Sequence, residues 1–169
     1  MPVEPEVKAA VETVAKFFAG QGAIVEPVQG IMSRAILDGL DTFFRARSWG
    51  DIEPMPAEQR AKIHPYTRRW AEGGAKLSGT QVIRGFNQTM ELRRLAALMF
   101  GKIDYLISPT APIPAFAAER ASPGDDPEHP FEHICFTVPW NFTEQPAVSI
   151  NAAFTKSGLP IGVQIIGRR

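Results

Sequence analysis

The spacing of apolar residues changes near residue 101, and this change limits the folds that are open to the chain. Before it, apolar side chains recur at three- and four-residue intervals, which predicts helices. The predicted helices cover residues 5–20, 32–49, 57–72 and 79–100. After it, short β-branched runs predict strands at residues 103–107, 147–150 and 161–166. The sequence therefore predicts an α/β fold with helices packed on a few strands.

Proline and glycine mark several boundaries. Pro5 suits the first position of a helix, where its missing N–H would have no partner within the helix. Gly20 and Gly22 accept the left-handed conformation that ends helices. Pro65 is expected to break or start a helix within residues 57–72.

Two further stretches carry specific expectations. The short β-branched run at residues 23–27 predicts a strand directly after the first helix, and that strand would need neighbours to pair with. Residues 79–100 contain so many apolar side chains that we expect a well-buried helix.

The longest predicted connection runs from residue 109 to about residue 129. It contains a Gly-Asp-Asp sequence at 124–126 and five prolines: Pro109, Pro112, Pro114, Pro123 and Pro127. A connection of this length inside a compact domain is usually functional or mobile. Residues 157–160 (SGLP) predict a tight turn between the last two strands.

Composition excludes several classes of protein. The 169 residues fit one domain, and 18 basic residues balance 18 acidic ones, so no strong field favours nucleic acid or anionic membrane. The single cysteine, Cys135, cannot form an internal disulfide. The sequence shows no secretory leader pattern and no apolar run of spanning length. We therefore expect a soluble cytoplasmic protein without nucleic-acid or membrane partners.

The residues do not predict self-contained catalytic machinery. His129 and His133 are four apart, but Pro130 lies between them and no metal-ligand pattern accompanies them. Cys135 is expected to be a small core residue. The chain has neither a G-x-S-x-G turn nor a phosphate-binding glycine loop. We expect no metal site and no cofactor.

Three ordered blocks resemble the amidase-signature enzymes. Residues 104–112 (DYLISPTAP) are similar to the family's D-x-L-[IV]-x-P-T-x-P segment. Residues 136–147 (FTVPWNFTEQPA) resemble F-T-x-P-x-N-x-T-G-x-P-A, and residues 158–167 (GLPIGVQIIG) resemble G-L-P-[IV]-G-[IVL]-Q-[IVL]-I-G. Residues 3–23 fit the helix and strand that follow the family's catalytic core, although more loosely. The resemblance implies a single C-terminal amidase-like region over residues 1–169, incomplete at both ends.

The resemblance implies hydrolysis of a carboxamide to an acid plus ammonia or an amine through a Ser-Ser-Lys triad. In the family, those residues lie N-terminal to the region matched here. No two serines are adjacent in this chain, and none of its lysines has the matching context. No catalytic residue is therefore assigned, and the isolated chain is predicted to be inactive.

The family's C-terminal part completes the sheet and lines part of the cleft for a small-molecule amide substrate. On that basis the candidate pocket residues are Phe136, Thr137, Trp140 and Asn141, with plain strand and loop packing as the alternative. Asn141 can bond nearby backbone and hold a loop. Gln164 lies in an apolar strand and needs a partner if it is buried.

Two departures from the family pattern bear on function. Glu144 stands where the family usually has glycine, which predicts a different local turn without a left-handed residue. Ile134 stands where tRNA-dependent amidotransferase subunits usually carry aspartate, which favours a general amidase. Two alternatives remain: a non-catalytic, stand-alone homo-oligomer that reuses the fold, and a subunit of a split amidase or amidotransferase whose partner supplies the triad.

Overall fold

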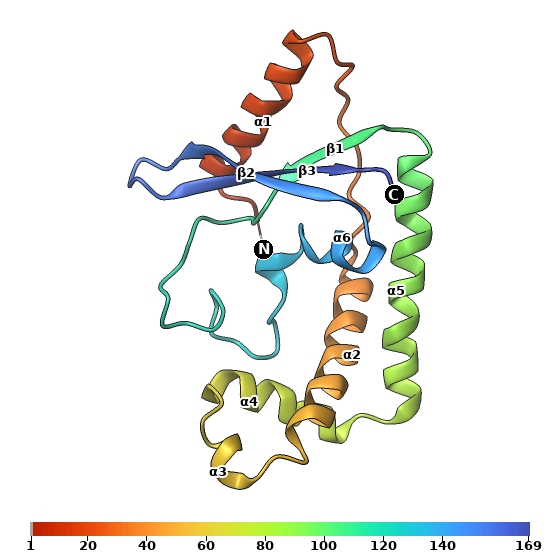
Figure 1. The fold of residues 1–169 in the computed structure, drawn as a ribbon, viewed down its shortest axis with the longest axis vertical. Coiled ribbons are helices and arrows are strands. Elements are labelled where there is room, and N and C mark those ends of the chain that lie inside the picture. The colour runs from red at the N-terminus through yellow and green to blue at the C-terminus, as the bar shows by residue number, and fades with distance from the viewer. Residues whose placement is uncertain (1) are drawn as a thin grey trace. The chain divides into compact units, whose positions relative to one another are not determined.

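The computed structural model describes residues 2–169 and shows helices combined with a small sheet (Figure 1). The helices are α1 (Pro5–Gly20), α2 (Arg34–Ile52), α3 (Ala57–Arg60), α4 (Pro65–Glu72), α5 (Gly79–Phe100) and α6 (Val138–Thr143), with 3-10 turns η1 (Gly73–Lys76) and η2 (Glu132–Ile134). The strands are β1 (Tyr105–Pro109), β2 (Ala147–Phe154) and β3 (Pro160–Gly167). The predicted α/β class is confirmed.

The chain divides into two compact units. The sheet unit contains the residues up to 32 together with 92–115 and 133–169, and the helical unit contains 33–91 and 116–132. Helix α5 therefore begins in the helical unit and ends in the sheet unit. Among residues 2–169, no helix is both long and apolar enough to cross a membrane.

The sheet has the order β1-β3-β2, and both pairings are antiparallel. Strands β2 and β3 form a hairpin whose turn contains Gly158 at a φ of 85°, a conformation that glycine adopts without steric cost. The predicted turn at residues 157–160 and both flanking strands are confirmed.

Each face of the sheet has its own apolar cluster. Val7 and Ala10 of α1 pack against Ile161 and Val163. On the other face, Ile166 packs with Ala96, Phe100 and Trp140. Successive strand residues point to opposite faces. The side chains of Ile161 and Val163 in β3 therefore pack in the cluster with α1, and that of Ile166 packs in the cluster on the other face. Figure 1 shows α1 on one side of the sheet and α6 on the other.

Within the helical unit, two glycines allow α2 and the first part of α5 to approach closely. A Cβ atom placed on Gly85 would lie 2.5 Å from the carbonyl oxygen of Gly39. Beside this crossing, the rings of Phe43 and Phe86 lie 5.4 Å apart. Gly74 lies against the backbone of Arg45, which brings η1 onto α2.

Two expectations about helices and strands are corrected, and one is confirmed. Residues 23–27 form no strand: Ile24 is 92% exposed, and no described strand pairs with this segment. The expectation that Pro65 breaks or starts a helix is confirmed, because residues 57–72 form two helices and Pro65 starts the second one. Helix α5 is not buried all round, since Ile83, Met90 and Leu98 are exposed while Leu92, Ala96 and Phe100 are buried.

The expectation for Glu144 is also wrong. Glu144 ends α6 with φ 59° and ψ 31°, which is the left-handed conformation. Glu144 therefore adopts the backbone conformation that favours glycine, even though it carries a side chain. Its backbone N–H donates to the carbonyl of Trp140, as expected at a helix end.

Candidate functional site

The four candidate pocket residues lie on one segment of the sheet unit. Part of this segment is helical, which the sequence did not predict. Residues 138–143 form the short helix α6, with Pro139 in its first turn and Thr137 at its N-cap. Phe136 and Thr137 are half-buried, Trp140 is buried and Asn141 is exposed. Asn141 therefore lies on a helix, not in the expected loop.

Gln164 ties this segment to the sheet. It is 3% exposed, and its Nε2 donates to Phe136 O at 2.6 Å, to Pro109 O at 2.9 Å and to Ser108 Oγ at 2.9 Å. Two hydrogens shared among three oxygens make a bifurcated arrangement. The prediction that a buried Gln164 needs a partner is confirmed, and the tie fixes the start of the candidate segment.

Trp140 fits the packing alternative at least in part. Its ring lies edge-on to Phe100 with centroids 6.0 Å apart, inside the apolar cluster around Ile166. However, three buried atoms of this region have no hydrogen-bond partner among the described residues: Trp140 Nε1, Thr143 Oγ1 and Gln145 Oε1. An unpaired buried polar group costs about 1–3 kcal/mol, so these three atoms lower the stability that the apolar packing of this region provides.

A row of polar side chains crosses the sheet on the face of Gln164. Ser108 and Ser149 stand opposite Gln164 on either side, and the hydroxyls of Thr110 and Ser149 hydrogen-bond to each other. Gly162 leaves room for them, because a Cβ there would lie 2.7 Å from Thr110 Oγ1. This row was not predicted from the sequence, although the alternation of polar residues in otherwise apolar strands is a signal for it.

These hydroxyls are not arranged as nucleophiles. The Ser108 hydroxyl accepts from the Gln164 amide, and the Ser149 hydroxyl is bonded to Thr110. A serine nucleophile requires an adjacent general base, and neither an amide nor a second hydroxyl is one. The row can therefore orient backbone and hold polar groups, but it supplies no acid–base step.

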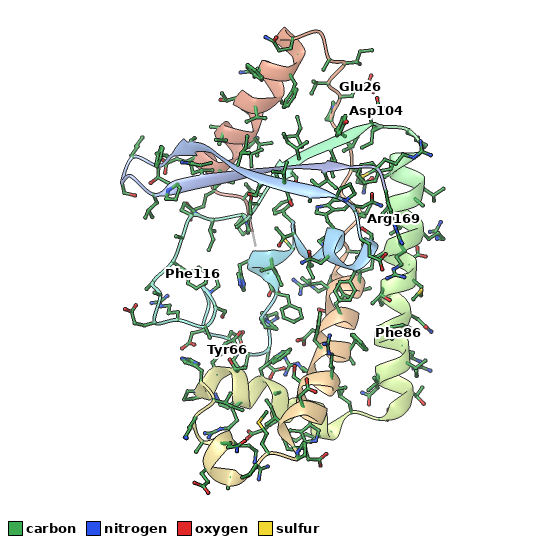
Figure 2. All side chains as sticks on the ribbon, in the orientation of Figure 1. Glu26, Tyr66, Phe86, Asp104, Phe116 and Arg169 are labelled. Atoms are coloured by element: carbon green, nitrogen blue, oxygen red, sulfur yellow. The ribbon has the colours of Figure 1, made fainter. Side chains whose placement is uncertain are left out.

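Glu144 joins three elements at the end of the candidate segment. Its Oε1 lies 2.9 Å from Arg93 Nη2, and its Oε2 lies 2.7 Å from Arg169 Nη1. Arg93 Nε also donates to the carbonyl of Phe142 at 2.8 Å. Arg169 is labelled in Figure 2. This cluster connects α5, the end of α6 and the residues after β3.

A second polar cluster lies within the helical unit, on α2 and α4. Asp41 accepts from Trp70 Nε1 and Arg45 Nε, each at 2.7 Å. Burial raises the pKa of Asp41 above its ordinary value, and the hydrogen bonds from Trp70 and Arg45 oppose that rise. Arg45 also donates to Pro127 O, while the Tyr66 hydroxyl (Figure 2) donates to the carbonyl of Asp126 at 3.0 Å.

Most of the long predicted connection is held on the helical unit. Residues 109–115 belong to the sheet unit and residues 116–132 to the helical unit, where Phe131 packs edge-on against Phe44 and Trp70. His129 Nδ1 lies 2.8 Å from Asp126 Oδ2. That hydrogen bond raises the pKa of His129 and lowers the pKa of Asp126.

Residues 2–169 contain no group of three or more His, Cys, Asp or Glu side chains placed to hold a metal ion. Both sequence-selected histidines lie near η2: His129 precedes it, and His133 is part of it. Cys135 is half-buried close by.

Comparisons with known proteins show which family this sequence matches. The amidase family profile matches residues 1–169. The A subunit of the glutamyl-tRNA(Gln) amidotransferase from Synechococcus strain CC9605 is 30% identical to this chain, and the match covers 98% of this chain and 38% of that protein.

Solved structures of amidase-signature enzymes have a similar fold. A bacterial aryl acylamidase of the amidase-signature family superposes with a TM-score of 0.78 at 23% identity, covering 100% of this chain and 38% of its own. The corresponding subunit of the Thermotoga maritima glutamyl-tRNA(Gln) amidotransferase superposes with a TM-score of 0.68 at 27% identity, covering 100% and 36%. The chain thus spans less than two fifths of the proteins that it resembles.

Proposed function

Because this chain belongs to the amidase-signature family along its whole length, we propose that it is the C-terminal portion of an amidohydrolase. The complete enzyme hydrolyses a carboxamide to an acid plus ammonia or an amine. The observation that carries the proposal is the superposition of this whole chain on 38% of an aryl acylamidase. The catalytic Ser-Ser-Lys triad belongs to the remaining portion, as the family resemblance implies.

The reaction that we propose is acyl transfer through a serine. The nucleophilic serine oxygen attacks the amide carbonyl carbon, its proton passes through the second serine to the neutral lysine, and backbone N–H groups stabilise the oxyanion. The C–N bond then breaks, and the leaving nitrogen takes the proton. Water hydrolyses the acyl-enzyme, which releases the acid and restores the serine. No cofactor takes part.

In this scheme the present chain shapes the substrate pocket. Phe136, Thr137, Trp140 and Asn141 are the proposed wall residues. The three hydrogen bonds from the Gln164 amide support the proposal, because they hold the start of this segment against the sheet. Rigid support of this kind is what a binding segment needs in order to keep its geometry.

A second candidate function has support from the curated relatives. Several of them are named as the A subunit of glutamyl-tRNA(Gln) amidotransferase, at 28–32% identity. In that case the chain would be part of a protein that works together with partner subunits. Ile134 argues against it, because the expected aspartate that would contact a substrate amino group is absent.

A third candidate is a non-catalytic homo-oligomer. Exposed apolar residues of the sheet unit support it, among them Ile24, Val148 and Phe154, because self-association would remove such side chains from water. A split enzyme, in which another chain supplies the triad, would use the same surfaces.

The test is a chimera in which the N-terminal portion of the bacterial aryl acylamidase is joined to this chain. We expect the folded chimera to release amine from aryl amides or ammonia from primary amides. Replacement of the nucleophilic serine of the grafted portion by alanine is the control and should abolish release. A folded chimera that cleaves no amide, beside an active parent enzyme, would overturn the proposal. Preference for glutamine over the other amides would favour the amidotransferase alternative.

A further inference from the structure

The end of the candidate pocket segment is held by a side chain from another helix. The last carbonyl groups of any helix lack donors within that helix. In α6 one of these carbonyls, that of Phe142, accepts from Nε of Arg93 on α5 at 2.8 Å. A cationic donor at a helix C-terminus also interacts favourably with the partial negative charge of the carbonyl groups there. Arg93 therefore acts as a side-chain cap for α6.

Glu144 holds the guanidinium of Arg93 in this position. Its Oε1 lies 2.9 Å from Arg93 Nη2, and its Oε2 lies 2.7 Å from Arg169 Nη1. A single guanidinium thus binds the carbonyl of Phe142 through Nε and the carboxylate of Glu144 through Nη2. The planar fork of arginine provides both donors at once, whereas a lysine ammonium is a single point charge.

The two ends of the candidate pocket segment are held by different means. At its start, the buried amide of Gln164 donates to Phe136 O at 2.6 Å. At its end, the hold depends on the charged pair of Arg93 and Glu144, whose side chains are 43% and 48% exposed. The amidase-signature pattern usually has glycine at the position of Glu144, and glycine has no side chain to supply this second hold.

We infer that Arg93 and Glu144 are positioning residues for the substrate pocket, and this inference rests on the proposed function. Neither side chain has to touch the substrate. Their contacts fix the end of α6, the helix that carries the proposed wall residues Trp140 and Asn141. A binding segment needs such support, because a site that is about 1 Å too loose loses its contacts.

The exposure of the pair distinguishes this role from a role in general stability. Half-exposed ion pairs contribute little to the free energy of unfolding, because solvent and salt screen them. Loss of the pair should therefore loosen the end of α6 and leave the rest of the sheet unit unchanged. High salt should have the same local effect, whereas the amide of Gln164 carries no charge for salt to screen.

Hydrogen exchange in the 169-residue chain tests the local hold. The reporters are the amides of Glu144 and Gln145, which donate to the carbonyl of Trp140, and the amides of β3 are the reference. We expect Glu144→Gln to speed exchange of the reporters about fivefold at low salt, the size that a half-exposed ion pair can reach. High salt should speed the reporters in the parent chain but have little further effect in this variant.

Two further variants complete the exchange experiment. Arg93→Gln should speed the reporters at least as much as Glu144→Gln, because it also removes the donor to Phe142 O. Adding Glu144→Gln to Arg93→Gln should change nothing more, since residues that act as one unit are not additive. Arg168→Gln removes a charge from the exposed neighbour of Arg169 and is the control that should leave the reporters unchanged.

Kinetics in the chimera with the aryl acylamidase N-terminal portion test the effect on the pocket. We expect Glu144→Gln to raise KM for an aryl amide about fivefold and to leave kcat within about twofold, because it weakens binding of ground state and transition state alike. Arg168→Gln should leave both constants unchanged. A role in stability alone would instead lower the amount of active enzyme and leave KM as it was.

The outcomes separate the positioning role from the proposed function. An active chimera in which Glu144→Gln leaves KM unchanged would overturn the positioning role alone. Equal exchange of the reporters in parent and variant would overturn it too, as would faster exchange that extends over β3. Faster exchange confined to the reporters, beside a chimera that cleaves no amide, would support the local hold and count against the proposed function.

Discussion

At the scale of single residues, Gln164 connects the sheet to the candidate pocket segment. Its amide is buried and serves three oxygens from β1 and from residue 136. A buried polar side chain of this kind is costly unless it is satisfied. Once satisfied, it specifies one position for the segment that it binds.

Replacing Gln164 by leucine should lower the free energy of unfolding by about 2 kcal/mol, because buried oxygens lose the donor that they share. Urea denaturation of the isolated chain measures the change. Gln59→Leu, on the surface of α3, serves as the control and should change stability by less than about 0.5 kcal/mol. Equal effects of the two substitutions would contradict the assigned role of Gln164.

Glu144 combines an unfavourable backbone conformation with favourable charge contacts. A residue other than glycine in the left-handed region costs about 1 kcal/mol. The contacts with Arg93 and Arg169 are half-exposed, so solvent screening leaves them at most about 1 kcal/mol in total. The two contributions are of similar size.

The expected result is that Glu144→Gly leaves stability nearly unchanged, because it removes both the strain and the ion pairs. Glu144→Ala keeps the strain and loses the pairs, so it should be about 1 kcal/mol less stable than Glu144→Gly. Denaturation at low and at high salt measures both variants. A glycine variant less stable than the alanine variant would show that the left-handed conformation is not strained.

At the scale of elements, the crossing of α2 and α5 depends on Gly39 and Gly85. A methyl group added at Gly85 would meet the backbone carbonyl oxygen of Gly39, so turning a side chain cannot accommodate it. Gly50 offers a matched comparison, since it also lies in α2 and a Cβ added to it would have no other atom within 4 Å.

We expect Gly85→Ala to destabilise the chain by about 2 kcal/mol through overpacking. Gly50→Ala should instead stabilise it by up to about 1 kcal/mol, because alanine is the better helix former. Thermal or urea denaturation distinguishes the signs. A neutral Gly85→Ala would mean that the two helices are further apart than the structure shows.

The connection of residues 116–132 carries a pH-dependent contact. The His129 pKa is raised by Asp126, so its contribution is complete below the ordinary histidine pKa of about 6.5 and is lost as pH rises through the raised value. The Asp126 pKa is lowered, so its contribution is complete above about 3.9 and is lost as pH falls through the lowered value. The contact is therefore strongest in mildly acidic solution.

Asp126→Asn should move the titration midpoint of His129 downward toward the ordinary value. Asp125→Asn should not, because Asp126 supplies the hydrogen bond to His129. Nuclear magnetic resonance of the His129 ring protons follows both titrations. An unchanged midpoint in Asp126→Asn would show that the pair does not form in solution.

At the scale of the whole molecule, the chain belongs to the amidase-signature family, but no catalytic residue is assigned in it. The hydroxyls that the structure brings together, those of Ser108, Thr110 and Ser149, bond to an amide or to one another. The isolated 169-residue chain is therefore expected to release neither ammonia nor amine from amides. Reproducible hydrolysis by the pure chain, unaffected by repeated purification, would contradict this expectation.

Part of the candidate site could be predicted from sequence. The segment of residues 136–141 could be selected as a candidate because its motif is contiguous, and its role in a pocket stays a prediction. The need of Gln164 for a partner follows from one polar residue in an apolar strand. The polar row of Ser108, Thr110 and Ser149 was missed because strand pairing brings those residues together from distant positions.

The sequence alone determined the α/β class, the hairpin of β2 and β3 and most helix boundaries, because these depend on local periodicity and turn chemistry, which neighbouring residues encode. The family resemblance rested instead on three contiguous motif blocks, at residues 104–112, 136–147 and 158–167. Only the tertiary structure decided that residues 23–27 remain unpaired, that Glu144 is left-handed and that two glycines meet between α2 and α5. The glycine contact and the ion pairs of Glu144 join residues that are distant in sequence, and local pattern carries no information about such partners.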